Sequence, residues 1–410
     1  MKSKLLSHSL IALFVILTLG VTVWSWVLID PNFTLINHAD WTQFRAIAIS
    51  IGYFQRQWSA NVYVTLILLL SIVSYGIVRW YKGPIVPLLI FIGIVAGLCS
   101  YPALSHDLFN YIFDARILTH YHVNPYLYKA LDFPGDSMLR FMHWVHRTYP
   151  YGPTYLLISL IPSALGLGIF SMTFFLFKAM HVIFFIIAGW LLSKHERTTA
   201  LLFITSPLII VEGLINSHND FIALSLGIVG VYVLQKRKNL FAFIVFLTSG
   251  LVKFISSPIL ILSIQDAVSR LIKVTPSVKD ANPFHRRLLT IFSRSWVYKS
   301  VQPWHLAFGG VVTLLIYLGV KQEIHPWYFL NLFLFLPFAP KVLEKCTIFF
   351  TGLLLSYYPY VVGGEWGQGG DVGVKRKIIL WGFLVNSVVL VSLWIWQSIS
   401  SWRRGRNIMQ

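Results

Sequence analysis

The chain has 410 residues, of which 56% are hydrophobic and only 12% are charged. This composition excludes an ordinary water-soluble domain and predicts an all-α polytopic membrane protein whose apolar segments are solvated by lipid. The formal net charge of +18 could suggest nucleic acid, but much of the positive charge stands in short clusters between hydrophobic segments, where it sets membrane orientation, so we expect no nucleic-acid partner.

The hydrophobic segments predict about twelve transmembrane helices in a single integral membrane domain, residues 1–410. Because basic loops stay in the cytoplasm, the first helix runs outward and both termini lie on the cytoplasmic side of the cell membrane. The basic segment 265–300 is the strongest cytoplasmic loop, and the cluster 375–377 is an exception, since it follows a Gly-rich outer loop. Either the assignment is off by one span there, or these cations face a bound anion outside. The predicted spans are residues 10–28, 61–79, 84–100, 172–192, 199–215, 221–234, 240–254, a short segment from Pro258, 303–320, 327–338, 347–362 and 378–398.

The segment 101–168 is rich in ionisable residues and predicts an extracytoplasmic loop with two interfacial helices. The first helix lies within 105–126, and the second follows Tyr151-Gly-Pro. At about 100° per residue, the first helix has a polar face and an apolar face. The polar face carries Asp107, Asn110, Tyr111 and Asp114. The apolar face carries Phe109, Ile112, Phe113 and Arg116. We expect the apolar face to meet lipid and the carboxylates to face a water-filled cavity.

The concentrated polar motifs all fall on the outer face of this topology. Ionisable residues at membrane boundaries are costly and usually functional, so the pattern indicates one composite site at the outer leaflet. In chain order, the motifs are His106-Asp107 ahead of a helix with Tyr111 and Arg116, Asn124-Pro125-Tyr126, Tyr151-Gly152-Pro153, Asn216-Ser217-His218-Asn219-Asp220, Leu251-Val252-Lys253-Phe254, and His325-Pro326-Trp327-Tyr328.

This order of motifs resembles the GT-C superfamily of polyprenyl-phosphate-sugar-dependent glycosyltransferases, and most of all its bacterial alpha-mannosyltransferase branch. The resemblance covers about residues 101–338. It implies that segment 101–168 is a catalytic loop, and that the chain transfers a hexose, mannose, from a polyprenyl-phosphate donor to a hydroxyl of a glycan, glycolipid or protein acceptor outside the cell. Some members have Asp-x-Asp or Glu-x-Asp where this chain has His106-Asp107, which leaves metal use open.

The chemistry of such a transfer needs a carboxylate base, cations for the leaving phosphate and aromatic rings for the sugar. Asp107 is the candidate base of an inverting reaction, because partial desolvation at the membrane would raise its pKa. Its alternative role is to cap the loop helix. The candidate phosphate ligands are Arg116, Lys253 and His325; Arg116 is equally well explained as an anchor to lipid headgroups.

The remaining candidates bind substrate. Residues 218–220 could hold sugar hydroxyls or a divalent cation, or could cap the following helix, and the aromatic residues could instead be membrane anchors. Zinc is not expected from His106 with His120 and His122, because no further ligand spacing supports it. We therefore expect no cofactor. The substrate-binding candidates are His106, Tyr111, Asp114, Tyr126, Tyr151, His218, Asn219, Asp220 and Trp327.

A transporter or flippase for a lipid-linked or anionic substrate is the alternative function. Such a protein places polar residues near the bilayer midplane and has inverted repeats. The sequence shows no repeat, and its midspan charges are limited to Lys253 and Lys178.

Overall fold

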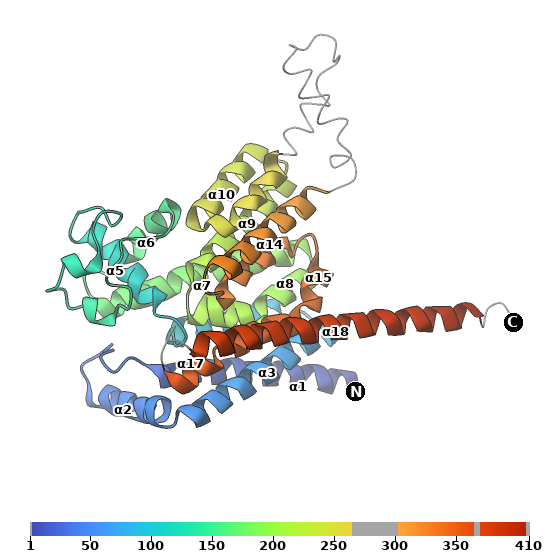
Figure 1. Cartoon of the computed structure of the whole chain (residues 1–410), viewed down its shortest axis with the longest axis horizontal. Helices are drawn as coiled ribbons and strands as arrows, with labels where there is room; N and C mark the ends of the chain where they lie inside the picture. The colour runs from blue at the N-terminus through green and yellow to red at the C-terminus, as the bar shows by residue number, and fades with distance from the viewer. Residues whose placement is uncertain (1, 265–301, 365–369, 407–410) are drawn as a thin grey trace, which may run out of the picture.

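The structure, a computed structural model, describes residues 2–264, 302–364 and 370–406. Within these ranges the chain is helical and has no β-strand, which confirms the predicted all-α class (Figure 1). The predicted basic loop 265–300 lies outside the described residues. The α-helices are α1 (Lys2–Ser25), α2 (Ala39–Phe54), α3 (Arg56–Trp80), α4 (Val86–Cys99), α5 (Asp107–Thr119), α6 (Pro153–Leu165), α7 (Phe170–His195), α8 (Arg197–Ile204), α9 (Asn219–Gln235), α10 (Asn239–Val252), α14 (Pro303–Lys321), α15 (Pro340–Lys345), α16 (Thr347–Leu355), α17 (Tyr358–Gly363) and α18 (Gly370–Arg406). The shorter 3₁₀ and π segments are η1 (Trp26–Leu28), η2 (Ala130–Asp132), η3 (Leu139–Phe141), η4 (Ile209–Ile215), η5 (Phe254–Ile259) and η6 (Pro326–Phe335).

Five helices of the described residues are long and apolar enough to cross a membrane, and α8 with η4 adds a sixth if this pair, bent by 64°, counts as one span. These findings support a membrane protein. Seven further apolar helices have only 10–17 residues, and all of them except Pro153–Leu165 overlap predicted spans. The total of twelve spans therefore stays a prediction. Prolines and polar side chains interrupt the apolar runs and so limit the length of the shorter helices. Pro326, for example, stands at the start of η6.

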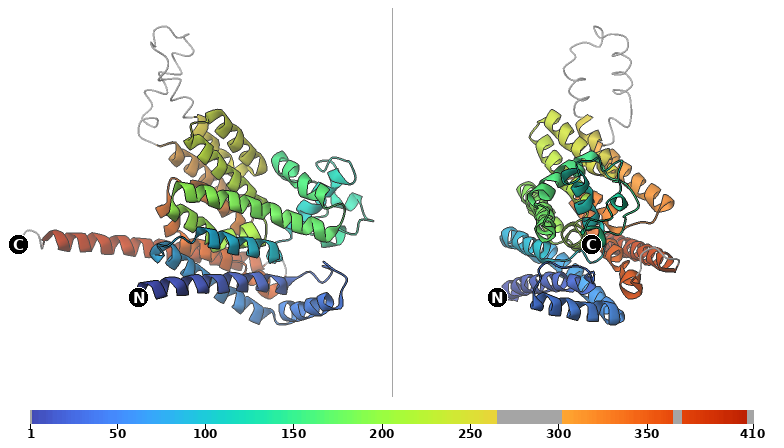
Figure 2. Two further views of the ribbon diagram at one scale, coloured as in Figure 1. Left: turned by 180° about the vertical axis from the view of Figure 1, so that it is seen from behind. Right: turned by 90° about the vertical axis from the view of Figure 1, so that its left-hand side faces the viewer.

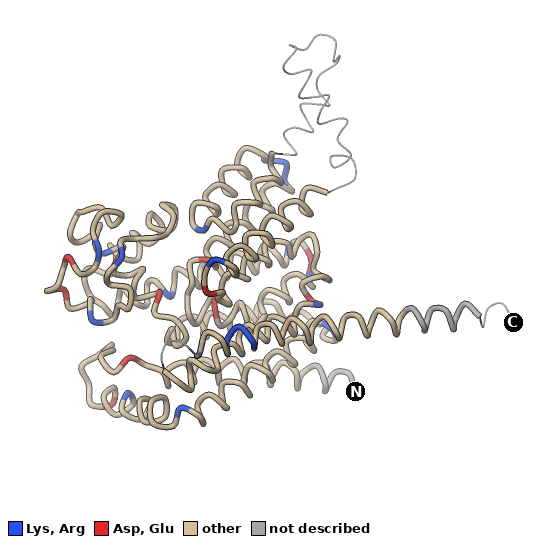
Figure 3. Tube along the Cα trace, viewed as in Figure 1, with Lys and Arg blue, Asp and Glu red and all other residues tan. Residues whose placement is uncertain are grey.

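The helices form a bundle in which α7 and α8 lie between the α1–α3 pair and the group formed by α9, α10 and α14 (Figures 1 and 2). Helix α18 extends well beyond this bundle at its carboxyl end. Its amino-terminal part packs closely against α16 where Gly352 meets Gly382. A Cβ atom added at Gly352 would lie only 2.9 Å from the Cα of Gly382. Charged residues gather between α5 and α6 and near the start of α18, while long stretches of the other helices have none (Figure 3).

Helix α5 is a core helix, and the prediction that its apolar face meets lipid is wrong. Phe109, Ile112 and Phe113 are buried within the protein. Phe109 packs in an aromatic cluster whose centre is Phe33, from the loop between η1 and α2. The other rings around Phe33 are Trp26, Trp41, Tyr101, Phe141, Phe170 and Phe174. The cluster gives the amino end of α5 a fixed position, because the ring contacts come from five separate segments of the chain.

Candidate functional site

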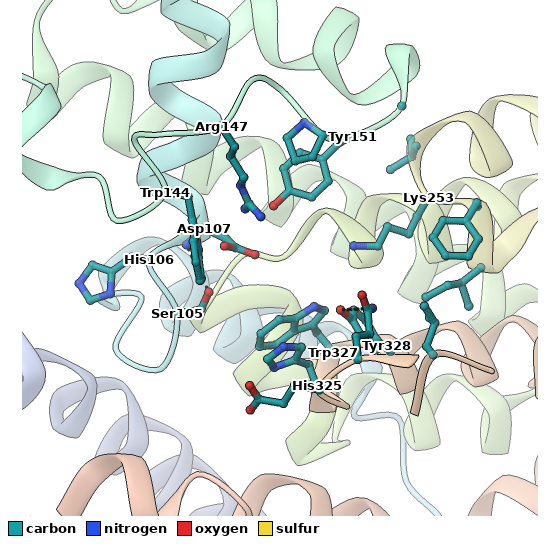
Figure 4. A pocket seen from close by; sticks show the side chains of 18 of the residues that line it. Ser105, His106, Asp107, Trp144, Arg147, Tyr151, Lys253, His325, Trp327 and Tyr328 are labelled. Atoms are coloured by element: carbon teal, nitrogen blue, oxygen red, sulfur yellow. Dashed lines mark hydrogen bonds between the residues drawn. The ribbon is translucent and has the colours of Figure 1, made fainter. Parts of the chain in front are cut away.

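A cavity of about 800 Å³ lies beside the amino end of α5. Most of its lining comes from four segments, within residues 105–107, 143–152, 250–255 and 318–328, and Tyr360 and Gly364 complete it. Figure 4 shows the side chains of Asp107, Arg147, Tyr151 and Lys253 directed toward a common space, with Trp327 and His325 on the opposite wall. The cavity thus brings together residues that the sequence separates by more than 200 positions.

Asp107 is the first residue of α5, and its carboxylate faces this cavity. His106, not Asp107, occupies the cap position of the helix, so the capping alternative is wrong. The Asp107 backbone N–H donates to Ser105 Oγ at 3.2 Å. Its Oδ2 atom accepts from the Tyr111 hydroxyl at 3.4 Å and lies 3.5 Å from His218 Nδ1. Because these contacts involve Oδ2, Oδ1 is available for a ligand in the cavity.

His218 lies between two carboxylates. Its Nε2 atom is 3.3 Å from Glu212 Oε2, while its Nδ1 faces Asp107. Glu212 Oε2 also accepts from Asn216 Nδ2 at 2.9 Å. Burial alone would lower the pKa of His218, but the two carboxylates outweigh it and raise the pKa to about 9. The imidazole is therefore protonated at neutral pH.

The same network keeps Asp107 ionised. Burial favours its neutral form, as the sequence predicted, but His218, Lys253 and Arg147 together lower the pKa of Asp107 to about 2. The expected rise in the pKa of Asp107 is thus wrong in direction, because opposite charges outweigh desolvation. The carboxylate is available as a proton acceptor at any physiological pH.

Lys178 fixes the turn that carries His218. This fully buried side chain, from α7, donates to Leu214 O at 2.6 Å and to Ile215 O at 2.8 Å. The Lys178 ammonium nitrogen also donates to Ser217 Oγ at 3.2 Å. Ser217 has a φ of 58°, which is unusual outside glycine. The remaining partner of Lys178 is Ser100 Oγ, at 3.0 Å, just ahead of the loop that leads to α5. One buried lysine therefore ties together the two segments that position Asp107 and His218.

Lys253 ends α10 and points into the cavity. Its ammonium forms an ion pair of 2.9 Å with Asp220 and lies 3.5 Å from Asn219 Oδ1. It also stands 5.3 Å from the ring centre of Tyr151 and 5.4 Å from that of Tyr328. Asp220 and Asn219 are fully buried and are not among the residues that line the cavity, so they hold Lys253 in place and do not reach a ligand there themselves.

Trp327 is the middle ring of a stack of three rings. Its ring stacks on His218, with centroids 4.0 Å apart, and on His325, with centroids 4.2 Å apart. Burial, together with the nearby charge of Lys375, holds the pKa of His325 well below its usual value. A neutral imidazole at this wall can donate a hydrogen bond to a phosphate but brings no positive charge, and the role of His325 as a phosphate ligand stays a prediction.

Besides His218, Asn219 and Asp220, four more of the predicted residues do not line the cavity. Arg116 forms an ion pair of 2.6 Å with Asp136 beside a separate pocket. Asp114 is buried in the protein, which raises its pKa to about 8 and keeps it neutral. Tyr126 is partly exposed and donates to Tyr151 O at 3.1 Å, and Tyr111 is buried behind Asp107.

Three charged residues of the site were not predicted from the sequence. Arg147 lines the cavity, with its guanidinium 4.8 Å from the ring centre of Trp144. It stands in a loop with many ionisable residues, so spacing alone could not select it. The sequence could have indicated Glu212, because a carboxylate within an apolar run needs a partner. It could also have indicated Lys375, which belongs to the exceptional basic cluster and contacts Glu323 at 2.7 Å and His325 Nδ1 at 3.2 Å.

The site residues from the first part of the chain lie within a match to a known family. The model described as alpha-(1->6)-mannopyranosyltransferase, N-terminal domain, matches residues 86–265, which include Asp107, Arg147, His218 and Lys253. This match supports a mannosyltransferase family and glycosyltransferase activity. Comparisons with curated proteins and with solved structures gave no match.

Proposed function

We propose that this protein is a membrane glycosyltransferase that moves mannose from a polyprenyl-phosphate donor to an acceptor hydroxyl on the extracytoplasmic face, with inversion at the sugar carbon. The observation that carries the proposal is the ionised Asp107 at a cavity that two cations and several aromatic rings also line. The match to a mannosyltransferase domain over residues 86–265 supports the sugar and the reaction class.

Asp107 acts as the general base. As the acceptor oxygen bonds to the sugar carbon, its proton passes to Asp107 and the bond from that carbon to the phosphate oxygen breaks. Attack from the face opposite the phosphate inverts the configuration. The products are the glycoside, a polyprenyl monophosphate with one more negative charge than the donor diester, and one proton on Asp107.

Arg147 and Lys253 stabilise the departing phosphate. Both side chains point into the cavity (Figure 4), and Asp220 orients Lys253 through their ion pair. Charge develops on the phosphate as the sugar bond breaks, so these cations favour the transition state over the ground state. Bound phosphate also offsets the two positive charges that lower the pKa of Asp107, and this raises the basicity of the carboxylate when the donor is present.

Aromatic rings complete the sugar subsite. Tyr151, Trp327 and Tyr328 line the cavity near Asp107 and Lys253. Flat rings of this kind cover the apolar face of a hexose, while His325, as a neutral imidazole, supplies hydrogen bonds to its hydroxyls. The apolar residues Leu251, Phe254 and Leu318 line the side of the cavity toward α10 and α14, where the first isoprene units of the donor would lie.

The test is transfer of radiolabelled mannose from polyprenyl phosphate mannose by the purified protein. Asp107→Asn keeps the size of the side chain and removes its basicity, so turnover falls by roughly 10²–10⁴-fold, and donor binding is retained. Asp132→Asn, which removes an exposed carboxylate of the same loop, retains wild-type turnover. Near-normal turnover in Asp107→Asn, or retention of configuration in the product, contradicts the proposed mechanism.

A further inference from the structure

Three side chains with metal-binding chemistry meet beside the cavity, and two of them, His106 and His143, line it. Asp30, His106 and His143 each offer one ligand atom, and these atoms lie within 4.8 Å of one another. They come from three separate segments: the loop between η1 and α2, the cap of α5, and the segment between η3 and α6. Their meeting is therefore a product of the fold that sequence spacing does not suggest.

The contacts around these residues leave ligand atoms available. Asp30 Oδ1 accepts from the Asn32 backbone N–H at 2.6 Å, a contact that orients the carboxylate and leaves Oδ2 for another partner. The Tyr101 hydroxyl accepts from the Asp30 backbone N–H at 3.1 Å, which fixes the position of the loop. His106 Nδ1 is buried and has no hydrogen-bond partner among the described residues. A buried polar atom without a partner is costly, and a bound cation would supply the partner.

The distances are compatible with one ion after a small side-chain movement. A tetrahedral ion with bonds of about 2.0–2.1 Å keeps its ligand atoms about 3.3 Å apart. The two imidazole rings stack with centroids 3.9 Å apart and planes at 11°, so both cannot aim at one ion without rotation. His143 is exposed and can turn about its side-chain torsions, whereas His106 is held at the start of α5.

We propose that Asp30, His106 and His143 bind one divalent transition-metal ion of the zinc class. Two imidazoles and a carboxylate are the ligand set of many zinc sites in which the fourth position stays open. Imidazole ligands favour such an ion over magnesium or calcium, which prefer oxygen. His106 and His143 line the cavity, so the open position of the ion lies at the cavity wall. His120, one of the histidines whose spacing was considered for zinc, lies instead beside Arg116 in a separate pocket.

The ion would join three segments around the candidate active site. It would fix the residue next to Asp107 in the chain and hold the segment that leads to Trp144 and Arg147. The effect of the ion on the active site rests on the proposed function, but the binding of the ion does not. The two ideas therefore fail separately.

The experiment measures metal binding without any sugar donor. The full-length protein, purified in detergent without a histidine tag and stripped with a chelator, is titrated with Zn²⁺ in a calorimeter and with Co²⁺ in a spectrometer. We expect one ion per chain and the intense visible absorption of tetrahedral Co²⁺. His143→Ala and Asp30→Asn weaken Zn²⁺ binding by at least about 100-fold, since loss of an outer partner alone costs 10–100-fold.

The matched control is His146→Ala, which removes a nearby histidine of the same segment that is outside the cluster. This variant keeps wild-type affinity for Zn²⁺, and Asp107→Asn still binds one ion per chain. A stoichiometry well below one, or equal affinity in His143→Ala and His146→Ala, overturns the site. If Asp107→Asn loses transfer but keeps the ion, the metal site and the proposed base are both supported; if it keeps transfer and the ion, only the proposed function fails.

Discussion

The charge of Asp107 is set by residues from distant parts of the chain. His218 lies 3.5 Å from it, and the charges of Lys253 and Arg147 act on it across the cavity. The sequence identified Asp107 through its motif, but it gave the wrong direction for the pKa because it did not show these neighbours. At the level of single residues, then, composition indicates which groups can react, and the fold decides their protonation.

The first prediction separates the cations of the cavity from Arg116. Lys253→Met and Arg147→Gln remove positive charge at the leaving phosphate, so turnover at saturating donor falls by more than roughly tenfold. Arg116→Gln is the matched control, because it leaves Asp136 without its ion-pair partner but touches no part of the cavity. It lowers the melting temperature and retains turnover. If Arg116→Gln lost turnover as strongly as Arg147→Gln, the result would support Arg116 as a phosphate ligand, which was one of its two roles proposed from the sequence.

The second prediction concerns the buried Asp114. Its pKa is raised in the folded protein to about 8, so its contribution to stability is fully present below about 3.8 and is lost as the pH rises toward 8. Asp114→Asn mimics the neutral acid and removes this loss. We expect the melting temperature of the variant to exceed that of the wild type by a few degrees at pH 8, and turnover to stay near normal. The measurement is thermal unfolding in detergent between pH 4 and pH 8; parallel curves for the two proteins would contradict a raised pKa.

At the scale of elements, most predicted segments coincide with helices. The second interfacial helix is α6, and the predicted span 172–192 lies within α7. What the pattern could not show is which helices are surrounded by protein. Helix α5 has one polar and one apolar face, as an interfacial helix does, but both faces are buried because α6 and the aromatic cluster around Phe33 cover it. Amphipathicity specifies a difference between faces, and only tertiary packing specifies what each face meets.

The third prediction tests the turn between η4 and α9. Lys178→Met leaves the buried carbonyl of Ile215 without its Lys178 donor, at a cost of about 1–3 kcal/mol, and leaves Leu214 O with the Ser217 hydroxyl as its side-chain donor. The turn then holds His218 less firmly, so both the melting temperature and turnover fall. Lys194→Met, at the exposed end of the same helix, is the control and changes neither. An unchanged melting temperature in Lys178→Met would show that the buried lysine does not secure this turn.

At the scale of the whole molecule, the arrangement of helix ends agrees with the charge pattern. The carboxyl ends of α7 and α9, which precede two basic clusters, lie together, with Gln235 Nε2 3.2 Å from His195 Nδ1. The exceptional cluster at 375–377 lies instead beside the site, through the contact of Lys375 with Glu323. This placement fits the second of the two interpretations of that cluster, in which its cations face a bound anion, because Lys375 lies beside the cavity where we propose that the donor phosphate binds. Sequence alone could not decide between them, because the partner of Lys375 is 52 positions away.

The fourth prediction tests orientation in the membrane. In a background with Cys99→Ser and Cys346→Ser, cysteines at Lys194 and Arg237 are shielded in intact cells from an impermeant thiol reagent, and one at Ser137 is labelled. All three positions are exposed, so labelling reports the side of the membrane and not burial. Ser137 is preferable to the neighbouring Asp136, which is buried and paired with Arg116. Labelling at Lys194 and Arg237 with none at Ser137 would reverse the topology and move the cavity to the cytoplasm.

The burial of Glu212 has a consequence for the order of events in one catalytic cycle. Asp107, His218 and Glu212 form a row that leads from the cavity into the interior, and Glu212 at its far end is fully buried. A proton received by Asp107 therefore has no outlet through Glu212 and returns to solvent by the cavity itself. That path is occupied until the glycoside departs. Sugar transfer should thus precede acidification of the medium, and a rapid-mixing experiment with a pH-indicator dye should record a lag between the two; simultaneous signals would mean that the proton leaves by another route.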